Sequence, residues 1–142
     1  MSSASKIALI GAGNMGGALA AGWLRSKRSG VTPQDLLIVD PAPGDAAQAL
    51  ITQYQLQQAS AANAKLLAGV DLIVLAVKPQ ALEKIAAVLA PQLPAGCAIL
   101  SVMAGITMTR LATMFGDRPI VRAMSNTAAA IGAGISVCVA NE

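Results

Sequence analysis

The chain has 142 residues, of which 55% are hydrophobic and only 12% are charged, and its net charge is +3. This length indicates a single domain with a real core. The absence of histidine excludes a histidine base and a histidine-ligated zinc site, and the few cations and aromatic residues argue against a nucleic-acid partner.

Short aliphatic runs alternate along the chain with segments of helical spacing. The expected strands are 6–10, 36–40, 56–59, 71–77, 97–103, 119–124 and 134–141. The expected helices are 14–27, 45–54, 60–69, 79–93 and 107–115. This alternation predicts an α/β fold, a Rossmann-type doubly wound, mostly parallel sheet in which the last strands are candidates for antiparallel pairing. The apolar run at 71–77 is the strongest and is expected at the sheet centre.

Local signals fix several expected boundaries. Thr32 and Pro33 predict a short helical start, Pro79 begins a helix, and Thr107 and Gly116 bracket another. Cys97 and Cys138 lack metal-ligand spacing and lie in apolar runs, which predicts two reduced core residues of a cytoplasmic protein without a bound metal. The uncharged stretch 7–24 is too interrupted by glycine to predict a membrane span.

The sequence GAGNMG, which follows the first expected strand, has the spacing G-x-G-x-x-G. In such a turn the first glycine permits the bend, the second lets the backbone approach a pyrophosphate, and the third lets helix and strand pack closely. The N–H groups that open the next helix favour phosphate. The predicted cofactor-binding residues of this turn are Gly11, Ala12, Gly13, Asn14, Met15 and Gly16.

Asp40 ends the second expected strand, where a carboxylate accepts hydrogen bonds from the ribose hydroxyls of a bound adenosine. A 2′-phosphate there would be repelled, and the segment 41–64 contains no Lys or Arg to offset the repulsion. The cofactor is therefore predicted to be NAD(P)H, with NADH preferred over NADPH. A ligand-free glycine turn and a secretory signal peptide are the alternatives for this region.

Three further stretches accompany IGAGNMGGALA: LAVKPQ at 75–80, SVMAGIT at 101–107 and RAMSNTAAAIGAG at 122–134. Together, from Lys6 to Glu142, they resemble the pyrroline-5-carboxylate reductases. The resemblance implies that residues near the nicotinamide end and one asparagine near the adenosine also bind the cofactor. These residues are Asn63, Ala76, Val77, Lys78, Pro79, Val102, Met103, Ala104 and Asn126.

Plainer interpretations of these implied residues stay open. Lys78 and Pro79 also suit a helix start, Asn63 suits a polar surface, and a turn at 103–105 needs no ligand. Ser125 and Ala128 stand where the family commonly has prolines. The resemblance also implies that residues 1–142 form the NAD(P)-binding domain alone. The family's helical second domain, which dimerises and supplies most of the substrate pocket, would then be missing from this chain.

The reaction implied by the resemblance is hydride transfer from the nicotinamide to the C=N carbon of 1-pyrroline-5-carboxylate, which gives L-proline. No catalytic residue is assigned, and a cofactor-binding half alone is expected to be inactive. Full-length forms are expected to be homo-oligomers that act on this small molecule, with no membrane partner. Two alternatives remain: another NAD(P)-dependent reductase, of the β-hydroxyacid dehydrogenase or deazaflavin-dependent type, and a non-catalytic dinucleotide-binding module.

Overall fold

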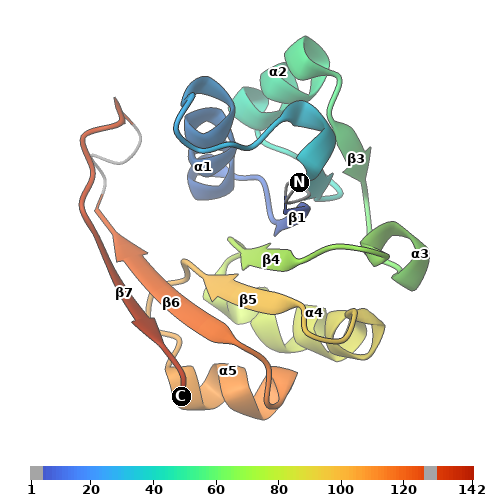
Figure 1. Ribbon diagram of the computed structural model, residues 1–142, viewed down its shortest axis with the longest axis vertical. Coiled ribbons are helices and arrows are strands. Elements are labelled where there is room, and N and C mark those ends of the chain that lie inside the picture. The colour runs from blue at the N-terminus through green and yellow to red at the C-terminus, as the bar shows by residue number, and fades with distance from the viewer. Residues whose placement is uncertain (1–4, 127–130) are drawn as a thin grey trace.

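A computed structural model describes residues 5–126 and 131–142. Seven strands form one sheet in the order β3-β2-β1-β4-β5-β6-β7 (Figure 1). All neighbouring pairs are parallel except β6 and β7, which are antiparallel. The strands are β1 (Ile7–Ile10), β2 (Leu36–Val39), β3 (Gln57–Ala59), β4 (Leu72–Leu75), β5 (Ala98–Ser101), β6 (Ile120–Ser125) and β7 (Ser136–Ala140).

Helices cover the two faces of the sheet (Figure 1). They are α1 (Asn14–Arg25), α2 (Asp45–Tyr54), α3 (Ala64–Leu67), α4 (Leu82–Leu89) and α5 (Met108–Phe115). Short 3-10 helices occupy Pro33–Asp35, Pro79–Ala81 and Ala90–Gln92. The predicted doubly wound fold is confirmed, including β4 as the middle strand and the antiparallel end of the sheet. None of the helices in the described ranges is both long and apolar enough to cross a bilayer.

The core divides into two layers because successive strand residues point to opposite faces. Leu9, Ile38 and Val74 belong to the layer under α1 and α2. Ile73, Leu75 and Ile99 belong to the layer under α3, α4 and α5. Each strand of the sheet centre is therefore apolar on both faces, as parallel strands between helices require.

Two expected helices are shorter in the structure. The expected helix at 60–69 is reduced to α3, which begins after the N-cap Asn63. The expected helix at 79–93 is α4 with a 3-10 turn at each end. Prolines explain this division, because Pro79 and Pro91 lie in those two turns and a proline nitrogen donates no helical hydrogen bond. Thr107 caps α5 as predicted, with its hydroxyl accepting from the Arg110 N–H, and the helix ends at Gly116.

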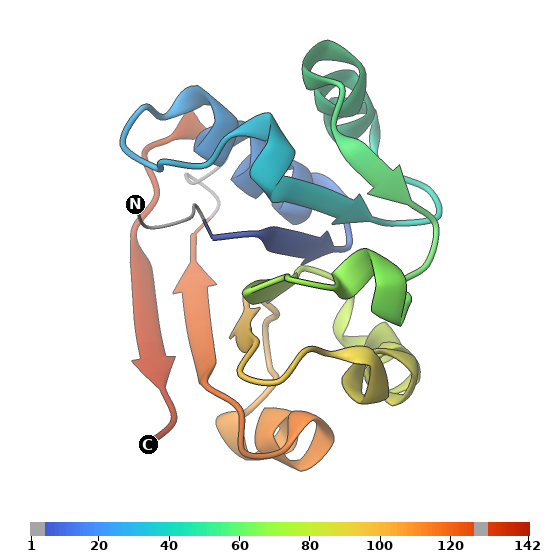
Figure 2. The same cartoon turned by 45° about the vertical axis from the view of Figure 1, so that its right-hand side comes forward.

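One prediction about the cysteines is wrong. Cys97 is buried, but Cys138 is exposed at the middle of β7. Strand β7 lies at the open edge of the sheet beside β6 (Figure 2), and every residue in it is exposed. Its apolar composition resembles that of a core strand, but burial depends on what covers a strand, and an edge strand gains cover from one neighbour only.

Candidate dinucleotide site

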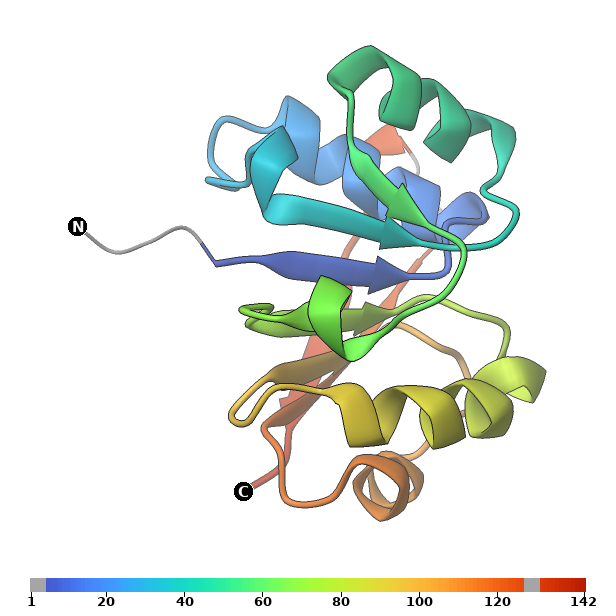
Figure 3. The same cartoon turned by 90° about the vertical axis from the view of Figure 1, so that its right-hand side faces the viewer.

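The glycine turn between β1 and α1 lies at the carboxyl end of the parallel strands, which point the same way (Figure 3). Gly11 has a φ of +93°, and a Cβ placed on it would lie 2.7 Å from the carbonyl oxygen of Ala76. A Cβ on Gly16 would overlap the carbonyl oxygen of Gly11. These two glycines are therefore required by the chain's own backbone, as the motif predicts for its first and third positions.

Gly13 has a different environment from the other two glycines. A Cβ on Gly13 would meet no atom within 4 Å, so the folded chain does not require glycine there. Gly13 is the N-cap of α1, whose first turn contains no acidic residue, and the first N–H groups of a helix have no partner within it. The open space in front of Gly13 suits a phosphate group that approaches the backbone, and this is the fit expected for a dinucleotide.

Asp40 joins the glycine turn to the loop that leads into α2. Its Oδ2 accepts a 2.7 Å hydrogen bond from the Ala12 N–H, and its Oδ1 accepts one of 2.8 Å from the Ala42 N–H. The Gly44 N–H donates back to the Ala12 carbonyl at 2.9 Å. A carboxylate has about four acceptor positions, so Asp40 retains capacity for ribose hydroxyls while it holds the loop in place.

A cavity of about 620 Å³ extends from the glycine turn to α4, a volume within the range of small-molecule and cofactor sites. Six of the predicted site residues line it: Gly11, Gly13, Asp40, Ala76, Val77 and Lys78. Its walls are mainly aliphatic, and its charged residues are Asp40, Lys78 and Lys84. One acid and two cations thus border a mostly apolar cavity next to the N–H groups at the start of α1, which can bind phosphate.

Ten of the predicted residues do not line this cavity: Ala12, Asn14, Met15, Gly16, Asn63, Pro79, Val102, Met103, Ala104 and Asn126. Asn63 caps α3, with its Oδ1 accepting from the Leu66 N–H at 3.0 Å. Met103 is buried, and Asn126 accepts a 3.2 Å hydrogen bond from the Ile135 N–H across the β6–β7 connection. Thr127 and Ala128, the next residues of the RAMSNTA stretch, lie outside the described residues.

Three groups of cavity residues were not predicted. Ile10 and Val39 end β1 and β2, and Pro41 and the segment 60–62 come from the loops after β2 and β3. The remaining residues come from the N-cap of α4 and from one face of that helix: Ala81, Lys84, Ile85, Val88 and Leu89. The helical spacing of the α4 residues is visible in the sequence, but which face meets the cavity depends on the packing of α4. The absence of Lys and Arg from 41–64 therefore does not leave the cavity without cations, because Lys78 and Lys84 enter it from elsewhere.

Comparison with known proteins identifies one family model and several relatives that match most of this chain. Residues 6–105 match the sequence model of a family described as NADP oxidoreductase coenzyme F420-dependent. A pyrroline-5-carboxylate reductase from Pseudomonas aeruginosa is 39% identical over 140 residues, which are 98% of this chain and 50% of the relative. The chain spans about half the length of the curated relatives it matches.

Solved structures with similar folds include two reductases. A pyrroline-5-carboxylate reductase from Coxiella burnetii superimposes with a TM-score of 0.85 and 26% identity, over 99% of this chain and 51% of the other. A pyrroline carboxylate reductase from Plasmodium falciparum, solved with NADP bound, gives a TM-score of 0.80 and 26% identity, over 98% of this chain and 49% of the other. The fold and the glycine turn are thus those of a nicotinamide dinucleotide-binding domain.

Proposed function

Since the chain belongs to the family described as coenzyme F420-dependent NADP oxidoreductases, we propose that it is the cofactor-binding half of a pyrroline-5-carboxylate reductase. The observation that carries the proposal is the cavity that joins the glycine turn, Asp40 and the segment 76–78. Gly13 faces open space there, which explains a glycine that the fold itself does not need. The similarity to pyrroline-5-carboxylate reductases over nearly the whole chain supports the choice of reaction.

The residues of this chain bind and orient the cofactor. The N–H groups at the start of α1 hold the pyrophosphate, and Asp40 accepts from the adenosine ribose while it fixes the turn through Ala12 and Ala42. The bound nicotinamide supplies the hydride for an oxidoreductase reaction. The implied residues Val102–Ala104 and Asn126 follow β5 and β6 at the same carboxyl edge, and we place them on the nicotinamide side.

The proposed substrate is 1-pyrroline-5-carboxylate, whose C=N carbon takes up the hydride to give L-proline. The matched relatives are about twice as long as this chain. We propose that a second domain of that length completes the substrate pocket and joins two copies, and that the chain alone binds the cofactor without turnover. The proposed compartment is the cytoplasm, where free thiols such as Cys97 and Cys138 stay reduced.

The cofactor preference follows from the charge of Asp40. Two unit charges about 4 Å apart repel each other by about 4 kcal/mol at an effective dielectric constant near 20. A 2′-phosphate beside Asp40 meets this repulsion, whereas a 2′-hydroxyl donates a hydrogen bond to the carboxylate. We therefore propose that NADH binds more tightly than NADPH, although the P. falciparum relative was solved with NADP.

A chimaera tests the proposed function. The first half of the P. aeruginosa reductase is replaced by this chain, and NADH oxidation is followed with 1-pyrroline-5-carboxylate. Turnover is expected, and it should disappear in the same chimaera carrying Gly13→Val. The family description supplies the second candidate, hydride transfer between NADP and the deazaflavin coenzyme F420. Reduction of F420 by this chain with NADPH would favour the second candidate. A chimaera that binds NADH but does not turn over the pyrroline would contradict the proposed reaction and favour a sensing module.

A further inference from the structure

One face of α4 forms a wall of the cavity. Lys84 and Val88 line it four residues apart, with Ile85 and Leu89 beside them and the N-cap Ala81 three residues before Lys84. Residues with this spacing share one face of a helix. Lys84 is the one cation in the α4 sequence, LEKIAAVL. Its side chain is thus the charge that α4 contributes to the cavity.

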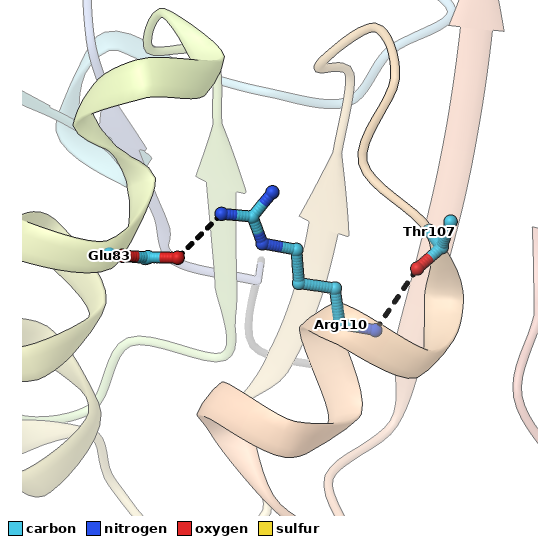
Figure 4. Close-up of polar contacts among 3 residues, drawn as sticks. All are labelled: Glu83, Thr107 and Arg110. Carbon is cyan, nitrogen blue, oxygen red and sulfur yellow. Dashed lines mark hydrogen bonds and ion pairs between the residues drawn. The ribbon is translucent and has the colours of Figure 1, made fainter.

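The acidic residue next to Lys84 is already paired elsewhere. Glu83 Oε1 accepts a hydrogen bond of 2.6 Å from Arg110 Nη2, and the Arg110 backbone N–H donates to Thr107 Oγ1 at 3.2 Å (Figure 4). In the ranges 5–126 and 131–142 this is the only ion pair within 4.0 Å. Arg110 therefore pairs with Glu83, and Lys84 has no ion-pair partner in that part of the chain.

Asp40 borders the same cavity but does not form an ion pair with Lys84. Both Asp40 oxygens instead accept hydrogen bonds from backbone N–H groups of the glycine turn and the following loop. Asp40 and Lys84 are thus two separated charges of opposite sign in a cavity that also contains Lys78. Asp40 disfavours a phosphate on the adenosine ribose, whereas a lysine side chain attracts phosphate.

Lys78, the second cation of the cavity, has a different neighbourhood. It follows Ala76 and Val77, which lie against Gly11, so it lies beside the glycine turn. Lys84 is six residues further along a 3-10 turn and α4, which corresponds to about 10 Å of axial rise. A dinucleotide that uses both lysines therefore needs a second phosphate position away from the pyrophosphate.

We propose that Lys84 recognises a phosphate on the adenosine ribose and is the specificity-determining residue that limits how strongly this site discriminates against NADPH. The proposal rests on the proposed cofactor function, because it concerns the same cavity. Asp40 sets the preference for NADH, and Lys84 reduces its size. Without Lys84 the repulsion from Asp40 acts on NADPH without an opposing charge, so the preference for NADH increases.

The test compares adenosine 2′,5′-bisphosphate with 5′-AMP, which differ only in the 2′-phosphate, by calorimetric titration of the chain. The variants are Lys84→Gln, Lys84→Arg and the control Lys65→Gln, an exposed cation of α3 that does not line the cavity. Loss of one nearby opposite charge in a partly exposed site is expected to weaken the bisphosphate about tenfold at low salt. The affinity for 5′-AMP should stay within about twofold in Lys84→Gln, and Lys84→Arg should retain bisphosphate binding because it keeps the charge.

The outcomes distinguish a failure of the role of Lys84 from a failure of the proposed cofactor function. Equal weakening of both ligands by Lys84→Gln, no weakening of either, or the same effect from Lys65→Gln would overturn the role of Lys84. In each of these cases a wild-type chain that binds NADH leaves the cofactor function intact. A wild-type chain that binds neither NADH nor NADPH overturns the cofactor function and the role of Lys84 together.

Discussion

Gly11 and Gly13 of the turn differ in what an added methyl group is expected to do to stability and to cofactor binding. Gly13→Ala adds a methyl group where no atom lies within 4 Å, at a φ of −77°. The free energy of unfolding should stay within about 1 kcal/mol of wild type. Gly11→Ala places its methyl group 2.7–2.9 Å from Ala76 and Val77 at a φ of +93°. Overpacking of about 1–3 kcal/mol and a left-handed alanine of about 1–2 kcal/mol sum to a loss of roughly 2–5 kcal/mol.

For NADH binding, in contrast, we expect Gly13→Ala to be damaging. The Gly13→Ala methyl group fills the space in front of the α1 N-terminus, so the dissociation constant for NADH should rise at least about tenfold, or about 1.4 kcal/mol. Urea unfolding followed by Trp23 fluorescence measures stability, and calorimetric titration measures binding. Gly22→Ala is the matched control, because Gly22 lies within α1 with nothing within 4 Å and outside the cavity. A stable Gly13→Ala variant that binds NADH as tightly as wild type would refute the assigned role of the turn.

The Asp40 carboxylate, the two thiols, and the hydrogen bonds that Thr32 donates to the Asp35 carboxylate at the start of the 3-10 helix Pro33–Asp35 each give a further measurable result. Asp40→Ala removes the acceptors of two backbone N–H groups, so urea unfolding should show a loss of about 1–3 kcal/mol, and the ratio of NADPH to NADH affinity should rise; unchanged stability would contradict these hydrogen bonds. A thiol reagent should modify Cys138 in the native chain and Cys97 only after unfolding, because burial raises the pKa of the Cys97 thiol and shields it; rapid modification of both would contradict the burial of Cys97. Hydrogen bonds from the Thr32 side chain and N–H lower the pKa of Asp35 below 3.8, so the stabilisation relative to Thr32→Val should be fully present above that value and lost as the pH falls through the lowered pKa; a difference that persists in strong acid would exclude this origin.

Local patterns predicted most of the fold. The central strand at 71–77 was recognisable because a strand covered on both faces must be apolar at nearly every position, and β4 is the middle strand. The expected helix at 79–93 was too long because Pro91 was read as a helical residue, whereas it lies in the 3-10 turn Ala90–Gln92. Cys138 was misjudged because composition does not tell whether a strand lies at an edge.

In the site, too, local motifs could be predicted from the sequence but contacts made by tertiary packing could not. The glycine turn and Asp40 belong to one strand–turn–helix–strand unit, so a motif of fixed spacing could predict them. Lys84 belongs to a helix that enters the cavity through tertiary packing alone. Its helical spacing with Ala81 and Val88 was visible in the sequence, but no local pattern tells which neighbour a helix face meets. The charge that opposes Asp40 therefore became visible only in the folded chain.

The central claim is that a nicotinamide dinucleotide binds in front of the glycine turn and along the cavity to α4. The most direct test is an NMR titration of the isotope-labelled chain with NADH, in which the amide signals report on each residue. The largest shifts are expected at 11–16, 40, 42, 60–62 and 76–78, with little change in β7 at the far edge of the sheet. Saturable shifts confined to β6 and β7, or no saturable shift at the glycine turn, would contradict the claim.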